Sequence, residues 1–141
     1  MNKHASRADQ FLHEFSTWAS THEEILAVAL VGSYARGTAE SSSDIDLVIL
    51  CSRPDFYLEH DQWINQFGEV QKQQVEDYGK VTSIRIWYEN GLEVEYGLTG
   101  ADWAALPIDE GTLQVMQEGM KILFERSSLL SLYIAKESEG N

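Results

Sequence analysis

Two carboxylates, Asp44 and Asp46, stand one residue apart at the mouth of an apolar run over residues 45–51. On a β-strand, residues i and i+2 point to the same face, so these side chains project side by side from Cα atoms roughly 7 Å apart. Two like charges held so close repel each other unless a cation lies between them. The pair therefore predicts a site for divalent metal ions.

A glycine–serine turn lies just upstream of this pair, after an apolar run over residues 24–31. Gly32 has no side chain and lets the backbone come close to a ligand, and Ser33 adds a hydroxyl at the start of a short helix. Backbone N–H groups at a helix start are suited to bind phosphates. Arg36 is placed either to pair with a phosphate or to brace the turn against the acidic pair, and Ser43 completes the candidate nucleotide-binding residues.

A third carboxylate is available on a predicted β-hairpin. The Asn-Gly dipeptide at 90–91 is typical of a two-residue turn, and the return strand is expected over 92–98. In that register Ile86 lies opposite Glu95. Glu93 and Glu95 share one face of the return strand, opposite its apolar residues, so either can supply a carboxylate.

If this strand neighbours the one over 45–51, both glutamates lie near Asp44 and Asp46. The spacing does not decide which glutamate joins the aspartates, and for each one alone an exposed acidic strand face is the simpler interpretation. Three carboxylates around paired cations suit nucleotidyl transfer, in which two ions roughly 3.5–4 Å apart clamp an in-line displacement. Magnesium prefers such hard oxygen ligands.

A mixed arrangement of helices and strands is needed to bring these residues together. Helical spacing of apolar residues predicts a long amphipathic helix near the N-terminus, and runs rich in Val, Leu and Ile predict buried strands. The expected elements are a helix over 6–20, strands over 24–31 and 45–51, a helix from Pro54, a short apolar segment ending at Gly68, an edge strand over 70–78, strands over 81–88 and 92–98, a helical turn at 102–106, a helix over 109–118, a strand at 122–124 and a terminal helix over 128–136.

The segments 32–37 (GSYARG) and 43–47 (SDIDL), in this order between two apolar strands, are together more specific than either alone. They resemble the signature of the DNA polymerase beta-like nucleotidyltransferase superfamily. The resemblance is strongest to small bacterial members, which include antibiotic nucleotidyltransferases and the minimal nucleotidyltransferases of toxin–antitoxin pairs. The segment 92–96 (LEVEY) resembles the strand that carries the family's third carboxylate. The resemblance implies an α+β (mixed α/β) nucleotidyltransferase fold, with a mixed central sheet, helices packed mainly on one face, and a single domain over 1–141.

Position by position, the resemblance implies that Asp44 and Asp46 bind metal, with Glu95 favoured as the third ligand, and that these three carboxylates are catalytic. It also implies that Gly32 and Ser33 hold phosphates. The implied cofactor is Mg²⁺, as two ions when the nucleoside triphosphate is bound. In antibiotic-modifying relatives the third carboxylate also acts as a general base, a role that the resemblance implies here.

Charge and composition limit the partners. The 141 residues carry a formal net charge of -13, with ten Lys and Arg against 23 Asp and Glu and no basic cluster, which disfavours broad binding to nucleic acid. An acidic surface attracts cationic small molecules or a basic protein partner. No apolar run approaches the roughly 20 residues of a membrane span, and the polar N-terminus lacks a signal-peptide core, so we expect no membrane contact and a cytoplasmic location.

These observations favour a magnesium-dependent nucleotidyltransferase that moves a nucleoside monophosphate, AMP being favoured, from a triphosphate such as ATP to a hydroxyl of a small molecule or protein. One alternative is an antitoxin-like module that binds or modifies a partner toxin. Another is a non-catalytic nucleotide-binding protein, against which the intact aspartates argue. A homodimer could supply a further wall of the site, with Trp103 and Tyr34 at its edge.

Overall fold

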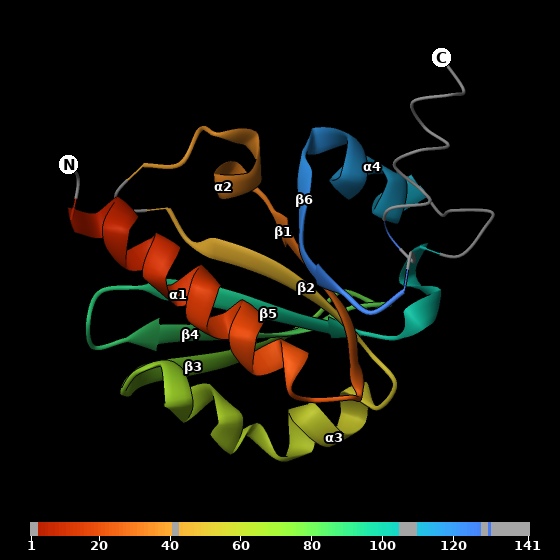
Figure 1. Ribbon diagram of the computed structural model, residues 1–141, viewed down its shortest axis with the longest axis horizontal. Helices are drawn as coiled ribbons and strands as arrows, with labels where there is room; N and C mark the ends of the chain where they lie inside the picture. Colours follow the sequence, from red (N-terminus) through yellow and green to blue (C-terminus); the bar gives the residue numbers. More distant parts are fainter. Residues whose placement is uncertain (1–2, 41–42, 105–109, 128–129, 131–141) are drawn as a thin grey trace.

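A six-stranded mixed sheet forms the centre of the protein in the computed structural model, which describes residues 3–40, 43–104, 110–127 and 130. The strands lie in the order β3-β4-β5-β2-β1-β6 (Figure 1). The elements in chain order are α1 (Lys3–Ser20), β1 (Ile25–Val31), α2 (Ser33–Arg36), β2 (Ile45–Cys51), α3 (Pro54–Glu59), η1 (Asp61–Phe67), β3 (Val70–Asp77), β4 (Thr82–Tyr88), β5 (Glu93–Thr99), η2 (Ala101–Ala104), α4 (Glu110–Glu118) and β6 (Met120–Glu125). The expected α+β class is confirmed.

Strand β2 lies at the middle of the sheet and connects its two halves. It pairs in parallel with β5 and antiparallel with β1, and the remaining neighbours, β3 with β4, β4 with β5 and β1 with β6, are antiparallel. Both faces of β2 are largely covered, which agrees with its continuous apolar sequence. The aspartates at its N-terminal end are thus attached to one of the best-packed strands of the protein.

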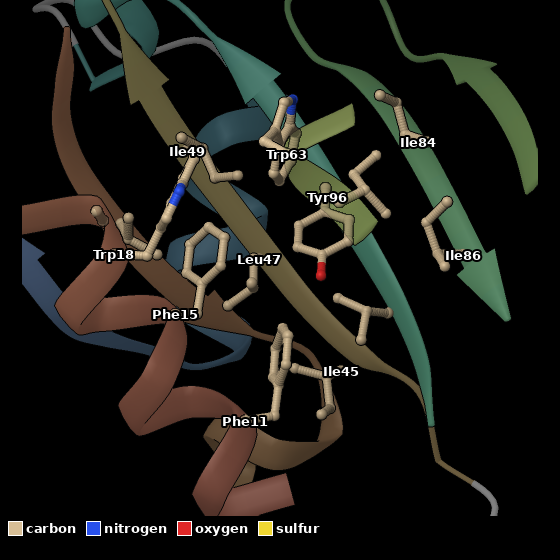
Figure 2. Close-up of a cluster of buried hydrophobic side chains, with 14 of the residues drawn as sticks. Phe11, Phe15, Trp18, Ile45, Leu47, Ile49, Trp63, Ile84, Ile86 and Tyr96 are labelled. Carbon is tan, nitrogen blue, oxygen red and sulfur yellow. The ribbon is translucent and has the colours of Figure 1, made fainter. Parts of the chain in front are cut away.

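The main hydrophobic core lies between the sheet and a layer formed by α1, α3 and η1 (Figure 1). On α1, Phe11, Phe15 and Trp18 follow helical spacing and are all buried. Figure 2 shows these side chains directed toward Leu47 of β2 and Tyr96 of β5. This layer covers one face of the sheet and leaves the other face for the polar residues of the same strands.

A smaller second layer covers part of the opposite face, over β1 and β2. Trp103 of η2 and Met116 of α4 pack there against Ala27 and Ala29 of β1, whose small side chains allow the close approach. Trp103 is expected at the edge of a wall supplied by a second copy of the chain, but it is only 2% exposed and offers little surface for such a contact. Tyr34 is half-buried and packs against the main core. Within the described ranges, this second cluster of buried residues does not extend over β4 and β5.

The hairpin between β4 and β5 has a three-residue loop over 89–91, not the expected two-residue turn. The backbone N–H of Tyr88 donates to the carbonyl of Leu92 (2.8 Å), and the last loop residue is a glycine with φ of +95°. This positive φ lets the third residue close the longer loop. The expected register, with Ile86 opposite Glu95, is therefore wrong by one residue.

The expected bounds of most other elements hold to within a few residues. The strand over 45–51 agrees with β2, the short helix begins at Ser33, and the segment 70–78 contains the edge strand β3. The expected terminal helix over 128–136 lies outside the described residues apart from Leu130, which is buried. Among the helices that the structure describes, none has the length and apolar character needed to cross a membrane.

Arg126, just after β6, ties the end of α1 to the start of β1. Its guanidinium donates hydrogen bonds to the carbonyl oxygens of Ala19 (3.1 Å), Ser20 (3.0 Å), His22 (2.8 Å) and Ile25 (2.8 Å). The last carbonyl groups of a helix have no partner within the helix, and a cation at this end is also favoured by the helix dipole. Arg126 thus fixes the end of β6 to the connection between α1 and β1.

We expect Arg126→Met to lower the free energy of unfolding by about 2 kcal/mol, because several carbonyl groups lose a charged donor at once. For a chain of this size the melting temperature should fall by roughly 4–8 °C in a thermal melt followed by circular dichroism. Lys121→Met removes an exposed cation from β6 and serves as the control, with a change within about 1 °C. Equal melting temperatures for the two variants would contradict this role of Arg126.

Candidate active site

Three predicted carboxylates converge on the open face of the sheet. Asp44 and Asp46 come from the start of β2, and Glu95 comes from β5, where it is the direct register partner of Asp46 in the parallel pair. One oxygen of each of Asp44, Asp46 and Glu95 can be chosen so that all lie within 4.8 Å of one another. The structure therefore brings together the three residues expected as metal ligands.

Asp46 of this acidic triad is partly buried. Its Oδ1 is buried and has no hydrogen-bond partner among the described residues. Burial raises the pKa of Asp46 to about 9, with further contributions from hydrogen bonds and charge repulsion by Asp44 and Glu95. A buried carboxylate oxygen without a donor indicates that a cation or a proton belongs at this position.

The glycine–serine turn lies directly against Asp46. Gly32 has φ of +76°, and a Cβ atom built on it would lie 2.3 Å from Oδ2 of Asp46. Both the backbone conformation and the contact therefore require glycine at this position. Ser33 follows at the start of α2 and lines the same cavity as the carboxylates. The sequence expectation that these two residues lie beside the acidic pair agrees with this placement.

Arg36 and Ser43 have different surroundings. Arg36 is exposed on α2 and lines the cavity, where its side chain passes over Gly119; no ion pair joins it to the acidic triad within the described ranges. The hydroxyl of Ser43 accepts a hydrogen bond from the backbone N–H of Glu40 (2.8 Å), and Ser43 is not among the cavity-lining residues. Arg36 is thus placed to meet a ligand, whereas Ser43 holds the loop before β2.

A residue that the sequence interpretation missed, Arg85 of β4, lies against the triad. Its guanidinium contacts Asp44 (3.0 Å) and Glu95 (3.3 Å) of the triad, together with Glu76 (2.8 Å) and Glu93 (2.7 Å). The hydrogen bond to Glu76 is the largest influence that raises the pKa of Arg85. Because β4 and β5 pair with Arg85 opposite Glu95, the cation is fixed in this position by the hairpin register.

A cavity of about 770 Å³ opens over the triad. Its walls come from the turn at Gly32 and α2, from the face of β2, β4 and β5 that carries Asp46 and Glu95, and from η2 and α4. The lining also contains apolar side chains, among them Val48, Val81, Trp103 and Val115. This volume is in the range of sites that enclose nucleotide-sized molecules, and its lining combines charged and apolar groups.

The chemistry of the triad fits a hard divalent cation. All three candidate ligands are carboxylates, and Mg²⁺ binds in proteins through a few carboxylates together with water and substrate phosphates. The unpartnered Oδ1 of Asp46 is an acceptor that a cation can satisfy. The group of carboxylates close enough to hold one ion contains Glu95 and not Glu93, so the geometry groups Glu95 with the two aspartates.

Comparison with family models gives one match that covers more than half of the chain. The model for the nucleotidyltransferase domain matches residues 11–97, which include the second half of α1, the turn at Gly32 and all three carboxylates. A comparison with curated protein sequences gave no match.

Solved structures share the fold. An aminoglycoside 6-adenyltransferase from Bacillus subtilis has a TM-score of 0.55 at 20% identity, over 74% of this chain and 37% of that chain. Cid1 in complex with the UTP analogue UMPNPP has a TM-score of 0.54 at 12% identity, over 84% of this chain and 34% of that chain. The non-canonical poly(A) polymerase complex GLD-2–GLD-3 has a TM-score of 0.50 at 18% identity, over 72% and 36%. The present chain therefore corresponds to about a third of the length of each of these structures.

Proposed function

The chain belongs to the nucleotidyltransferase domain family, and on this basis we propose that it transfers a nucleoside monophosphate from a triphosphate to an acceptor hydroxyl with the help of Mg²⁺. The observation that carries this proposal is the convergence of Asp44, Asp46 and Glu95 beside the turn at Gly32. A catalytically inactive member of the family would have no need to keep three carboxylates in this strained proximity.

Each group of the site has a role in this proposal. Asp44, Asp46 and Glu95 hold the metal ions, which when bound would acidify the attacking hydroxyl and balance the charge of the departing pyrophosphate. Ser33 and the backbone beside Gly32 hold the phosphates, and Arg36 lies at the rim of the cavity where it can pair with them. The apolar residues of the cavity lining, such as Val48 and Trp103, contact the less polar part of a ligand.

For the substrates we propose ATP as donor and a cationic, hydroxyl-bearing small molecule as acceptor. The likeness to an aminoglycoside 6-adenyltransferase supports an adenylyl donor, although that likeness concerns the fold. The net charge of -13 favours a cationic acceptor and disfavours a nucleic-acid acceptor. A basic partner protein that offers a hydroxyl is the second choice for the same electrostatic reason.

The direct test incubates the protein and Mg²⁺ with each α-³²P-labelled triphosphate and a panel of acceptors. The panel contains aminoglycosides, lincosamides and candidate partner proteins, and the label is followed by thin-layer chromatography and gel electrophoresis. We expect label from ATP on a small cationic acceptor. Label on a protein would select the second acceptor class, and no transfer with any pair, at metal and nucleotide concentrations that saturate binding, would contradict the proposed function.

We expect Ser33→Ala to weaken triphosphate binding by roughly 3–10-fold, because the phosphates lose one hydroxyl donor while the turn keeps its shape. Isothermal titration calorimetry with a non-hydrolysable ATP analogue and Mg²⁺ measures this change. The control is Ser52→Ala, an exposed serine outside the cavity, for which affinity should not change. Equal affinities for the two variants would remove Ser33 from the phosphate site.

A further inference from the structure

The guanidinium of Arg85 contacts two of the proposed metal ligands, so a metal ion bound there would compete with it for their carboxylates. Two of its four carboxylate partners, Asp44 (3.0 Å) and Glu95 (3.3 Å), belong to the acidic triad. The other two, Glu76 (2.8 Å) and Glu93 (2.7 Å), do not belong to the triad and make the shorter contacts. One cation is thus shared between a pair of proposed metal ligands and a pair of flanking carboxylates.

The sheet fixes this arrangement from three strands. Arg85 of β4 lies opposite Glu95 of β5 on one side and opposite Gln74 of β3 on the other. Glu76 reaches it from the same face of β3, and Glu76 in turn accepts a hydrogen bond from Tyr78. The side chain of Arg85 is 21% exposed, so much of its charge is withdrawn from water and acts on its neighbours with little screening.

We propose that Arg85 is a positioning residue that serves as the counter-cation of the triad before metal binds. It orients Asp44 and Glu95, offsets their mutual repulsion, and gives up these two carboxylates to the incoming metal while it keeps Glu76 and Glu93. This inference rests on the proposed function, because it assumes that the triad is the metal site. It assigns to this chain a built-in competitor for its own cofactor.

Two opposite effects follow from removing this charge. Without Arg85, the carboxylates repel one another in the metal-free protein, so the folded state loses stability. The same loss of a nearby positive charge makes the triad more attractive to a divalent cation, because like charges a few ångströms apart repel strongly in a partly buried site. A residue with a merely structural role would lower stability without increasing metal affinity.

The test measures Mn²⁺ binding in the absence of nucleotide, since Mn²⁺ accepts the same oxygen ligands as Mg²⁺ and its free form is visible by electron paramagnetic resonance. We expect Arg85→Gln to bind Mn²⁺ at least about fivefold more tightly than the wild type. Lys72→Gln is the matched control: Lys72 is an exposed cation on the neighbouring strand β3, 4.8 Å from the Trp87 ring, and its loss should change the affinity less than about twofold.

Thermal melts in EDTA and in saturating Mn²⁺ provide the second readout. Arg85→Gln should melt below the wild type in EDTA and should gain more from Mn²⁺ than the wild type gains. If Arg85→Gln does not fold, Arg85→Lys replaces it, because a lysine keeps the charge but cannot span the four carboxylates. Its Mn²⁺ affinity should also rise, by less than that expected for the glutamine variant.

The outcomes separate this inference from the proposed function. Unchanged or weaker Mn²⁺ binding by Arg85→Gln, or by Arg85→Lys if only that variant folds, overturns the role of Arg85. The metal site itself is tested by Asp46→Asn, which should abolish tight Mn²⁺ binding. If Asp46→Asn binds Mn²⁺ as the wild type does, the metal assignment of the triad is wrong and the proposed function fails with it.

Discussion

Asp46→Asn is expected to lower the rate of nucleotidyl transfer by at least about 10³-fold while the protein remains folded. The Oδ1 atom of Asp46 is buried and has no hydrogen-bond partner among the described residues. Asparagine has nearly the same shape, so the turn at Gly32 keeps its contact, but the site loses the charge that holds the metal. Single-turnover transfer of a labelled nucleotide at saturating substrate measures the change.

The same substitution should make the protein more stable at neutral and alkaline pH. The pKa of Asp46 is raised to about 9 in the folded protein, chiefly by burial, whereas an unfolded aspartate ionises near 3.8. A raised acid contributes stability that is fully present below the unfolded pKa and is lost as the pH rises through the folded pKa. In wild type the stability therefore falls as the pH increases toward 9, and asparagine removes this dependence.

Melting temperatures between about pH 6 and pH 8 measure this difference. Allowing for partial solvent screening, we expect the asparagine variant to gain roughly 2 °C over the wild type for each pH unit. Asp55→Asn is the control, since Asp55 is an exposed aspartate on α3 and its loss should affect neither the transfer rate nor the pH dependence. Transfer by Asp46→Asn at the wild-type rate would exclude Asp46 as a metal ligand.

Glu95→Gln is expected to reduce the transfer rate by about 10²–10³-fold, and Glu93→Gln by less than about tenfold. Glu95 is the parallel-register partner of Asp46 and completes the triad, whereas Glu93, two residues earlier on the same face, contacts Arg85. The two variants lose the same charge from the same strand, so the comparison isolates the position of the carboxylate. Rates at saturating metal and nucleotide are the measurement.

Measuring the Mn²⁺ affinity of the same two variants distinguishes a metal ligand from a general base. If Glu95 is a ligand, Glu95→Gln weakens both transfer and metal binding; a loss of transfer alone would leave it as a base. The reverse order of rates, with Glu93→Gln the slower enzyme, would move the third ligand to Glu93.

Local sequence patterns were sufficient to predict the part of the site that lies on one continuous segment. The aspartates alternate along a strand that is buried on both faces, and Gly32 directly precedes a short helix, so spacing alone placed these residues together. Both features depend on neighbours within about 15 residues. Pairing between strands that are distant in the sequence could not be predicted in this way. The spacing did not show that β5 lies parallel beside β2, and it is this pairing that places Glu95 next to Asp46.

The hairpin shows where the sequence interpretation failed and what could have corrected it. A two-residue turn places the apolar Ile86 across from Glu95, although residues paired directly across two strands share one face of the sheet. Pairing apolar with apolar residues instead sets Ile86 opposite Val94 and Arg85 opposite Glu95, as the structure has it. The alternation of apolar and polar residues in the two strands therefore predicts the observed register, whereas the Asn-Gly dipeptide does not. The correct register also places Arg85 opposite Glu95.

The composition of β3 has a consequence for behaviour in concentrated solution. A strand at the border of a sheet exposes unpaired backbone groups and can recruit another molecule into a growing aggregate. Strand β3 borders the sheet with the sequence VQKQQVED, in which charged and amide side chains predominate, and most of it is exposed. Replacing its lysine and glutamines with β-branched apolar residues would therefore be expected to promote fibre-like self-association, even where the folded monomer itself became no less stable.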